Sequence, residues 1–173
     1  MSATGTIAQI TNLATNTSFS AWATTNDFLV VIILAAAFFL FAWFMGRGAF
    51  VALLISLMAA YGPFIFFPYN SFLPKEPPMA ALLANAGVYA VITFVFFVVL
   101  KRVISSDFIY IGLLGRFILS FLGTAFLIAL ASHVFSISSI YQFTPAISAL
   151  FAQEQYFFWW FSGPAIGLLF FAR

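Results

Sequence analysis

Long apolar runs, separated by short polar or glycine- and proline-rich breaks, dominate the chain from residue 27 onward. At about 1.5 Å per residue, an uncharged helix of about 20 residues crosses a hydrocarbon layer about 30 Å thick. Four runs approach or exceed this length: residues 28–45, 49–67, 79–100 and 108–134. A fifth stretch, residues 156–172, is shorter and contains Gly163-Pro164, so it is either a fifth span or a re-entrant or surface helix.

The breaks indicate how the runs are connected. Gly46-Arg47-Gly48 suits a tight turn, so the first two runs are expected to form an antiparallel hairpin. Residues 68–78 contain four prolines and predict a loop. Residues 147–151 predict a short helix on the membrane surface. Residues 1–26 hold no Lys or Arg and predict a polar tail. We therefore expect an all-α transmembrane bundle, residues 27–173, with four or five spans.

Composition supports a membrane location. Hydrophobic residues make up 65% of the chain and charged residues only 6%, whereas about a quarter of the residues of a soluble domain are charged. A water-soluble fold of this length could not hide so much apolar surface, so the lipid bilayer is the expected partner. A net charge of +2 provides no electrostatic footprint for nucleic acid.

The few cations predict an orientation, because short cytoplasmic loops are enriched in Lys and Arg. Arg47 follows the first run, and Lys101 and Arg102 follow the third. These three residues are the expected cytoplasmic anchors, which places the N-terminus outside. The opposite side holds Lys75, offset by Glu76.

The fourth run carries a stripe of small and polar residues at helical spacing, which we call the α-stripe. One interpretation is a packing seam, because small residues let helices approach closely in lipid. The other is the wall of a polar path, with Arg116 favouring anions, although Arg116 also lies within snorkelling reach of the interface. The α-stripe consists of Gly112, Gly115, Arg116, Ser120, Gly123 and Thr124.

The inventory for chemistry is small. The chain has no cysteine, one histidine and four carboxylates, and it contains no nucleotide-binding, metalloprotease or nucleophile motif. Only His133, Glu154 and Asp27, all on the predicted outer side, could serve in such chemistry, and Asp27 is explained as the N-cap of the first helix. We therefore expect no catalytic residues, no metal and no cofactor, and a lipid-modifying enzyme is the least favoured hypothesis.

The layout resembles the colicin V production protein (CvpA) family of small bacterial inner-membrane proteins, over roughly residues 27–161. The resemblance rests on Gly46-Arg47-Gly48-Ala49-Phe50-Val51, Gly115-Arg116, Phe121-Leu122-Gly123, Gln142-Phe143-Thr144-Pro145 and the aromatic residues 157–161, with Arg47, Gly48, Phe50, Arg116 and Gly123 as the matching positions. The chain departs from the family at Ala52-Leu53, where more charge is usual, and at Gly115, where the family often has an Asp. The resemblance implies a role in envelope homeostasis or toxin export and implies no catalytic residue.

Two hypotheses for function follow. The first is a non-enzymatic scaffold or accessory subunit that packs against itself or joins a larger membrane complex. The second is a small oligomeric channel or transporter with a polar path along the fourth span.

Overall fold

The computed structural model describes residues 27–68, 73, 76–104, 111–135 and 143–171, and these form six α-helices and no strand. The predicted all-α bundle is therefore confirmed. The predicted polar tail, residues 1–26, lies outside the described residues.

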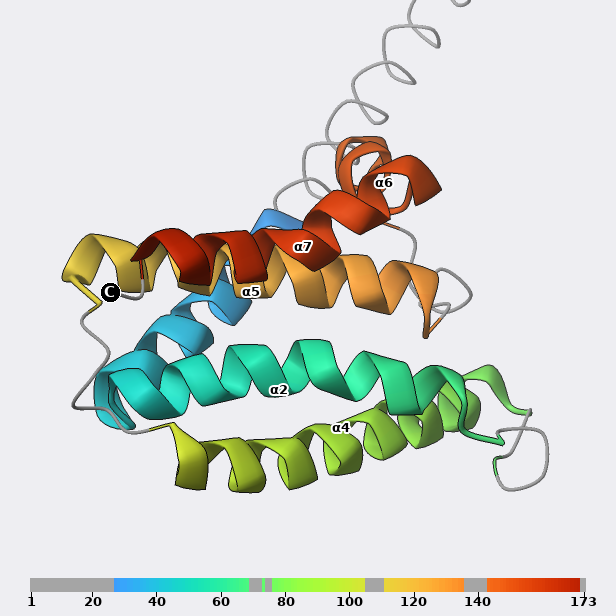
Figure 1. The fold of residues 1–173 in the computed structure, drawn as a ribbon. Helices are drawn as coiled ribbons and strands as arrows, with labels where there is room; N and C mark the ends of the chain where they lie inside the picture. The colour runs from blue at the N-terminus through green and yellow to red at the C-terminus, as the bar shows by residue number, and fades with distance from the viewer. Residues whose placement is uncertain (1–26, 69–72, 74–75, 105–110, 136–142, 172–173) are drawn as a thin grey trace, which may run out of the picture.

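Two antiparallel helical hairpins make up most of the fold (Figure 1). The first pairs α2, Arg47–Ile65, with α4, Pro78–Val103. The second pairs α5, Leu113–His133, with α7, Glu154–Phe171. The helix α5 begins later than the run expected from residue 108, because Gly112 is the extended residue that precedes it. Lys101 and Arg102, expected to follow the third run, form the last turn of α4.

The first helix, Asp27–Phe44, runs obliquely behind α5 and ends beside the start of α2 (Figure 1). The connection is only Met45 and Gly46, and Gly46 has a φ of 86°, a left-handed conformation that glycine adopts without strain. The tight turn predicted here is present. Gly48, expected to belong to it, is a buried residue of α2 instead.

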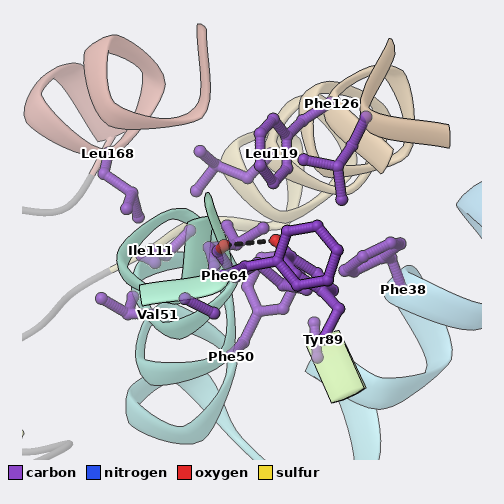
Figure 2. Packing of buried hydrophobic residues seen from close by; sticks show 14 residues of the cluster. Phe38, Phe50, Val51, Phe64, Tyr89, Ile111, Leu119, Phe126 and Leu168 are labelled. Carbon is purple, nitrogen blue, oxygen red and sulfur yellow. Dashed lines mark hydrogen bonds between the residues drawn. The ribbon is translucent and has the colours of Figure 1, made fainter. Parts of the chain in front are cut away.

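The core lies where the two hairpins and the first helix meet. Figure 2 shows side chains from all five long helices in one cluster, including Phe38, Phe50, Tyr89, Phe126 and Leu168. The Tyr89 hydroxyl donates a hydrogen bond to the Leu57 carbonyl, which ties α4 to α2 inside this cluster. Because a buried hydroxyl without a partner is costly in hydrocarbon, this bond accounts for a tyrosine in an otherwise apolar core.

The short helix α6, Pro145–Phe151, packs against the ends of its neighbours. Its buried face, Ile147 and Phe151, contacts residues of α5, and Trp160 Nε1 of α7 donates a 2.8 Å hydrogen bond to the Leu150 carbonyl. The predicted short helix is therefore longer than residues 147–151 and is docked onto the bundle.

In the part of the chain that the structure describes, four helices are long and apolar enough to cross a membrane: Asp27–Phe44, α2, α4 and α5. The helix α7 is not one of these four, although its 18 residues lie antiparallel alongside α5 and continue through Pro164 without interruption. A helix that packs lengthwise against a spanning helix has its axis in the same orientation relative to the bilayer. This packing is compatible with a fifth span, which stays a prediction.

Candidate functional site

The hydroxyl groups of the α-stripe are bonded within their own helix. Ser120 Oγ donates a 2.7 Å hydrogen bond to the Arg116 carbonyl, and Thr124 Oγ1 donates a 2.9 Å hydrogen bond to the Ser120 carbonyl. Both side chains are buried. A hydroxyl that bonds the carbonyl four residues earlier needs neither water nor a neighbouring helix. These residues therefore resemble packing positions more than the lining of a polar path.

Two glycines of the α-stripe, Gly115 and Gly123, face neighbouring helices. A Cβ built on Gly123 would lie 2.8 Å from Leu54 Cδ2 of α2 and 3.4 Å from Phe38 Cε1 of the first helix. A Cβ on Gly115 would lie 2.9 Å from Ile111 Cγ2 and 3.3 Å from Phe171 Cβ of α7. Gly112 precedes the helix, and nothing lies within 4 Å of its added Cβ. The close contacts at Gly123 and Gly115 are made within one chain, so they do not by themselves supply a surface for oligomerisation.

The glycine pair of α7 packs on the same helix. A Cβ on Gly167 would lie 2.7 Å from Leu122 Cδ1 and 2.9 Å from Leu119 Cδ2, and one on Gly163 would lie 3.4 Å from Leu122 Cδ2. The spacing of four residues between Gly163 and Gly167 therefore marks a helix-contact face.

The four cations within the described residues lie at one end of the bundle. Arg47 begins α2, Lys101 and Arg102 end α4, and Arg116 lies in the first turn of α5. Because the hairpins are antiparallel, these positions share an end in Figure 1. Lys101 Nζ lies 5.8 Å from the centroid of the Phe97 ring, one turn earlier on α4. Arg116 is half-buried, and its Nε has no hydrogen-bond partner among the described residues.

A lateral groove lies between the first helix and α5, with a volume of about 460 Å³. Three of its lining residues are small: Ala35, Ala36 and Ser120. The rest are apolar and include two phenylalanines of α5, so the groove suits an apolar occupant. The lining residues are Val31, Ile32, Ala35, Ala36, Phe39, Phe117, Ser120 and Phe121; we call this the lateral groove.

The three residues considered for metal or catalytic chemistry do not converge. Within the described part of the chain, no three His or carboxylate side chains are placed to share a metal ion. The His133 ring lies 4.8 Å from the Phe157 ring, centroid to centroid, and Glu154 is exposed at the start of α7.

Asp27 makes a contact that the sequence did not predict. It is almost completely buried, and its Oδ2 accepts a 2.6 Å hydrogen bond from the backbone N–H of Thr144, the residue that precedes α6. The carboxylate therefore stabilises the start of α6 across the fold, in addition to lying at the start of its own helix. A contact between residues 27 and 144 has no local sequence signal.

A second pocket, which sequence reasoning missed, lies at the end of the bundle opposite the cations. It has a volume of about 310 Å³ and is lined by Phe64, Ile65, Asn85, His133 and Val134. We call it the outer pocket. Asn85 could have drawn attention to it, because no other Asn or Gln occurs in the four long apolar runs.

The fold and these sites define a class: the chain is a polytopic, α-helical membrane protein with a lateral apolar groove and a small polar pocket at one end. Beyond the class, comparison of the chain with protein-family models, curated proteins and solved structures finds no match.

Proposed function

We propose that the protein is a non-enzymatic scaffold or accessory subunit that associates with another transmembrane helix through the lateral groove. The observation that carries this proposal is the lining of the groove by Ala35, Ala36 and Ser120 on two adjacent helices. In lipid, apolar surface alone does not drive association, whereas small residues allow the close approach that does. The occupant is a helix of a second copy or of a larger membrane complex.

The outer face of α4 differs from the lateral groove, because large side chains cover it. Over its 26 residues α4 buries only Tyr89 and Thr93, and its exposed positions are mostly valine, leucine and phenylalanine. Large apolar side chains suit contact with lipid tails. This face is therefore the matched negative control for association.

Photo-crosslinking in native membranes tests the proposal. A photoreactive amino acid at Ala36 is expected to give one discrete crosslinked species, and the same probe at Val95 on α4 is expected to give only lipid adducts. Both positions are exposed in the single chain. Ala36→Leu should abolish the complex, because it fills the groove, and Val95→Leu should leave it intact. Equal crosslinking from both positions, or a monomer with no partner, would contradict the proposal.

The narrower form of the proposal follows from the family resemblance. It places the protein in a bacterial inner membrane, in envelope homeostasis or toxin export. The positions of Arg47, Lys101 and Arg102 add an N-terminus on the outside. Since the chain has no cysteine, single cysteines at positions 47, 103 and 173 should be labelled from the cytoplasm and one at 153 from outside. Labelling of 153 and 173 from the same side would exclude a fifth span.

The channel hypothesis is less favoured because Ser120 and Thr124 bond their own helix. It predicts flux in proteoliposomes that falls in Arg116→Leu and Ser120→Leu variants. The scaffold proposal predicts no flux of ions or small metabolites for any of these proteins.

A further inference from the structure

Three cations of the first hairpin converge at one level of the bundle. The Tyr89 hydroxyl of α4 donates a hydrogen bond to the Leu57 carbonyl of α2, which fixes the register of this antiparallel pair. Arg47 lies about ten residues before Leu57, so it is level with the part of α4 about ten residues after Tyr89. Lys101 and Arg102 lie within about one helical turn of that level. We call Arg47, Lys101 and Arg102 the basic cluster; it occupies the left end of this hairpin in Figure 1.

The positive charge of the basic cluster is not offset by carboxylates. The carboxylates of the described ranges lie at the other end of the bundle: Asp27, Glu76 and Glu154. In the full sequence, Asp107 lies between α4 and α5 and Arg173 follows α7, and the charges of these two residues cancel. Arg116, in the first turn of α5, adds to the positive charge of this end. The field there favours an anion, because cations that converge repel one another.

Large apolar side chains surround the basic cluster. Val103 and Phe44, which are close to it in sequence, are 75% and 80% exposed. The centroids of the Phe41 and Phe97 rings are 6.1 Å apart, and Lys101 Nζ lies 5.8 Å from the Phe97 centroid, so the end of the first helix lies beside the cluster. A free phosphate ion would contact only the cations. A phospholipid fits both features, because its acyl chains cover apolar side chains while its headgroup lies at the level of the cations.

We propose that the basic cluster binds the headgroup of an anionic phospholipid in the leaflet that it faces. The long side chains of Lys101 and Arg102 extend to the headgroup from the end of a spanning helix, and their charges attract its phosphate. A zwitterionic lipid carries the same phosphate with an added positive charge, so it is a poorer ligand. The proposal does not depend on the scaffold function, because no residue of the basic cluster lines the lateral groove.

The same cations also predict the orientation of the chain, but lipid selectivity is a separate property. Orientation depends on how many cations each side carries, whereas selectivity for a headgroup depends on their convergence. A symmetric bilayer separates the two, because both ends of the protein then meet the same lipids.

Quenching of tryptophan fluorescence by brominated lipids tests the proposal at each end of the protein. Trp43 is exposed and lies two residues after Phe41, so it reports on the basic cluster. Trp159 and Trp160, near the start of α7, report on the opposite end. One protein keeps Trp43 alone and a second keeps Trp159 and Trp160, with the other tryptophans changed to Phe. Each is reconstituted in symmetric bilayers in which brominated phosphatidylglycerol or brominated phosphatidylcholine competes with unlabelled phosphatidylcholine.

The Trp43 protein is expected to prefer phosphatidylglycerol by about fivefold or more, because one Lys or Arg near an anionic surface contributes about that factor. The protein that keeps Trp159 and Trp160 is expected to show no preference. Lys101→Gln combined with Arg102→Gln should remove most of the preference at Trp43, whereas Lys101→Arg should retain it. Both side chains are exposed at the end of α4, so these variants are expected to fold. Glu154→Gln, at the opposite end, is the control and should leave the preference unchanged.

Three results would overturn the proposal. Equal quenching by the two lipids at Trp43 would exclude selective binding, and an equal preference at both ends would indicate a general attraction to anionic bilayers. A preference at Trp43 that survives the combined Lys101→Gln and Arg102→Gln change would show that the basic cluster is not its cause. None of these results bears on the scaffold proposal, whose crosslinks are measured at Ala36.

Discussion

The contact between α7 and α5 can be tested by adding one methyl group at Gly167. Its Cβ would lie 2.7 Å from Leu122 Cδ1 and 2.9 Å from Leu119 Cδ2. Leu119 is completely buried, so it has little room to move away. Overpacking of this kind costs about 1–3 kcal/mol. Against it stands the better helix propensity of alanine over glycine, about 1 kcal/mol.

Gly87 provides the matched control, because it also lies inside a helix but has nothing within 4 Å of its added Cβ. Gly87→Ala therefore carries the propensity gain alone. Since that gain is common to both variants, the difference in their free energies of unfolding isolates the clash. We expect Gly167→Ala to be less stable than Gly87→Ala by about 1–3 kcal/mol.

Reversible unfolding in mixed micelles, titrated with SDS and followed by circular dichroism, measures this difference. Gly163→Ala is an intermediate case, because its Cβ meets Leu122 Cδ2 only at 3.4 Å. The expected order of midpoints is Gly87→Ala highest, then Gly163→Ala, then Gly167→Ala. Coincident midpoints for the Gly87 and Gly167 variants would refute the described packing of α7 on α5.

Three further substitutions test separate contacts. Asp27→Asn should speed hydrogen exchange of the first amides of α6, because it weakens a charge-assisted bond worth about 1.5–3 kcal/mol; Glu154→Gln, at an exposed site, should not. Thr124→Val should change the free energy of unfolding in SDS by less than about 1 kcal/mol, because the lost bond lies within one helix, and a larger loss would indicate an interhelical partner. Trp160→Phe should increase proteolysis near α6 through loss of one hydrogen bond, about 0.5–1.5 kcal/mol, and unchanged cleavage would contradict that role.

The helices could be predicted because their signals are local. Uncharged runs of sufficient length specify spanning helices, and the glycine at position 46 specifies the turn, since its φ of 86° is strained for other residues. The positions at which the helices end were less predictable than the helices themselves. Lys101 and Arg102 read as a stop signal, yet cations are favoured in the last turn of a helix, and α4 includes them.

The sites could be predicted only in part, because they depend on which helices become neighbours. Spacing alone identified the small residues of α5 but could not say whether their close contacts would be with the same chain or with another. Gly123 meets Leu54 and Phe38, residues far away in sequence. The outer pocket likewise brings together Asn85 and His133 from two hairpins. In the sequence, each of these residues looks like an ordinary interfacial side chain.

Under the proposed scaffold function, the distribution of small residues, more than hydrophobicity, indicates where a partner helix would bind. In water, the exposed phenylalanines and valines of α4 would mark an interface. In lipid they gain nothing by leaving the acyl chains, so the same face indicates lipid contact. The α-stripe on α5 packs against other helices of the same chain. The lateral groove is then the exposed surface where Ala35 and Ala36 allow a helix to approach closely. A partner bound there would contact the first helix and α5 together, and it would cover Ser120 without needing a polar group of its own, because that hydroxyl is already bonded.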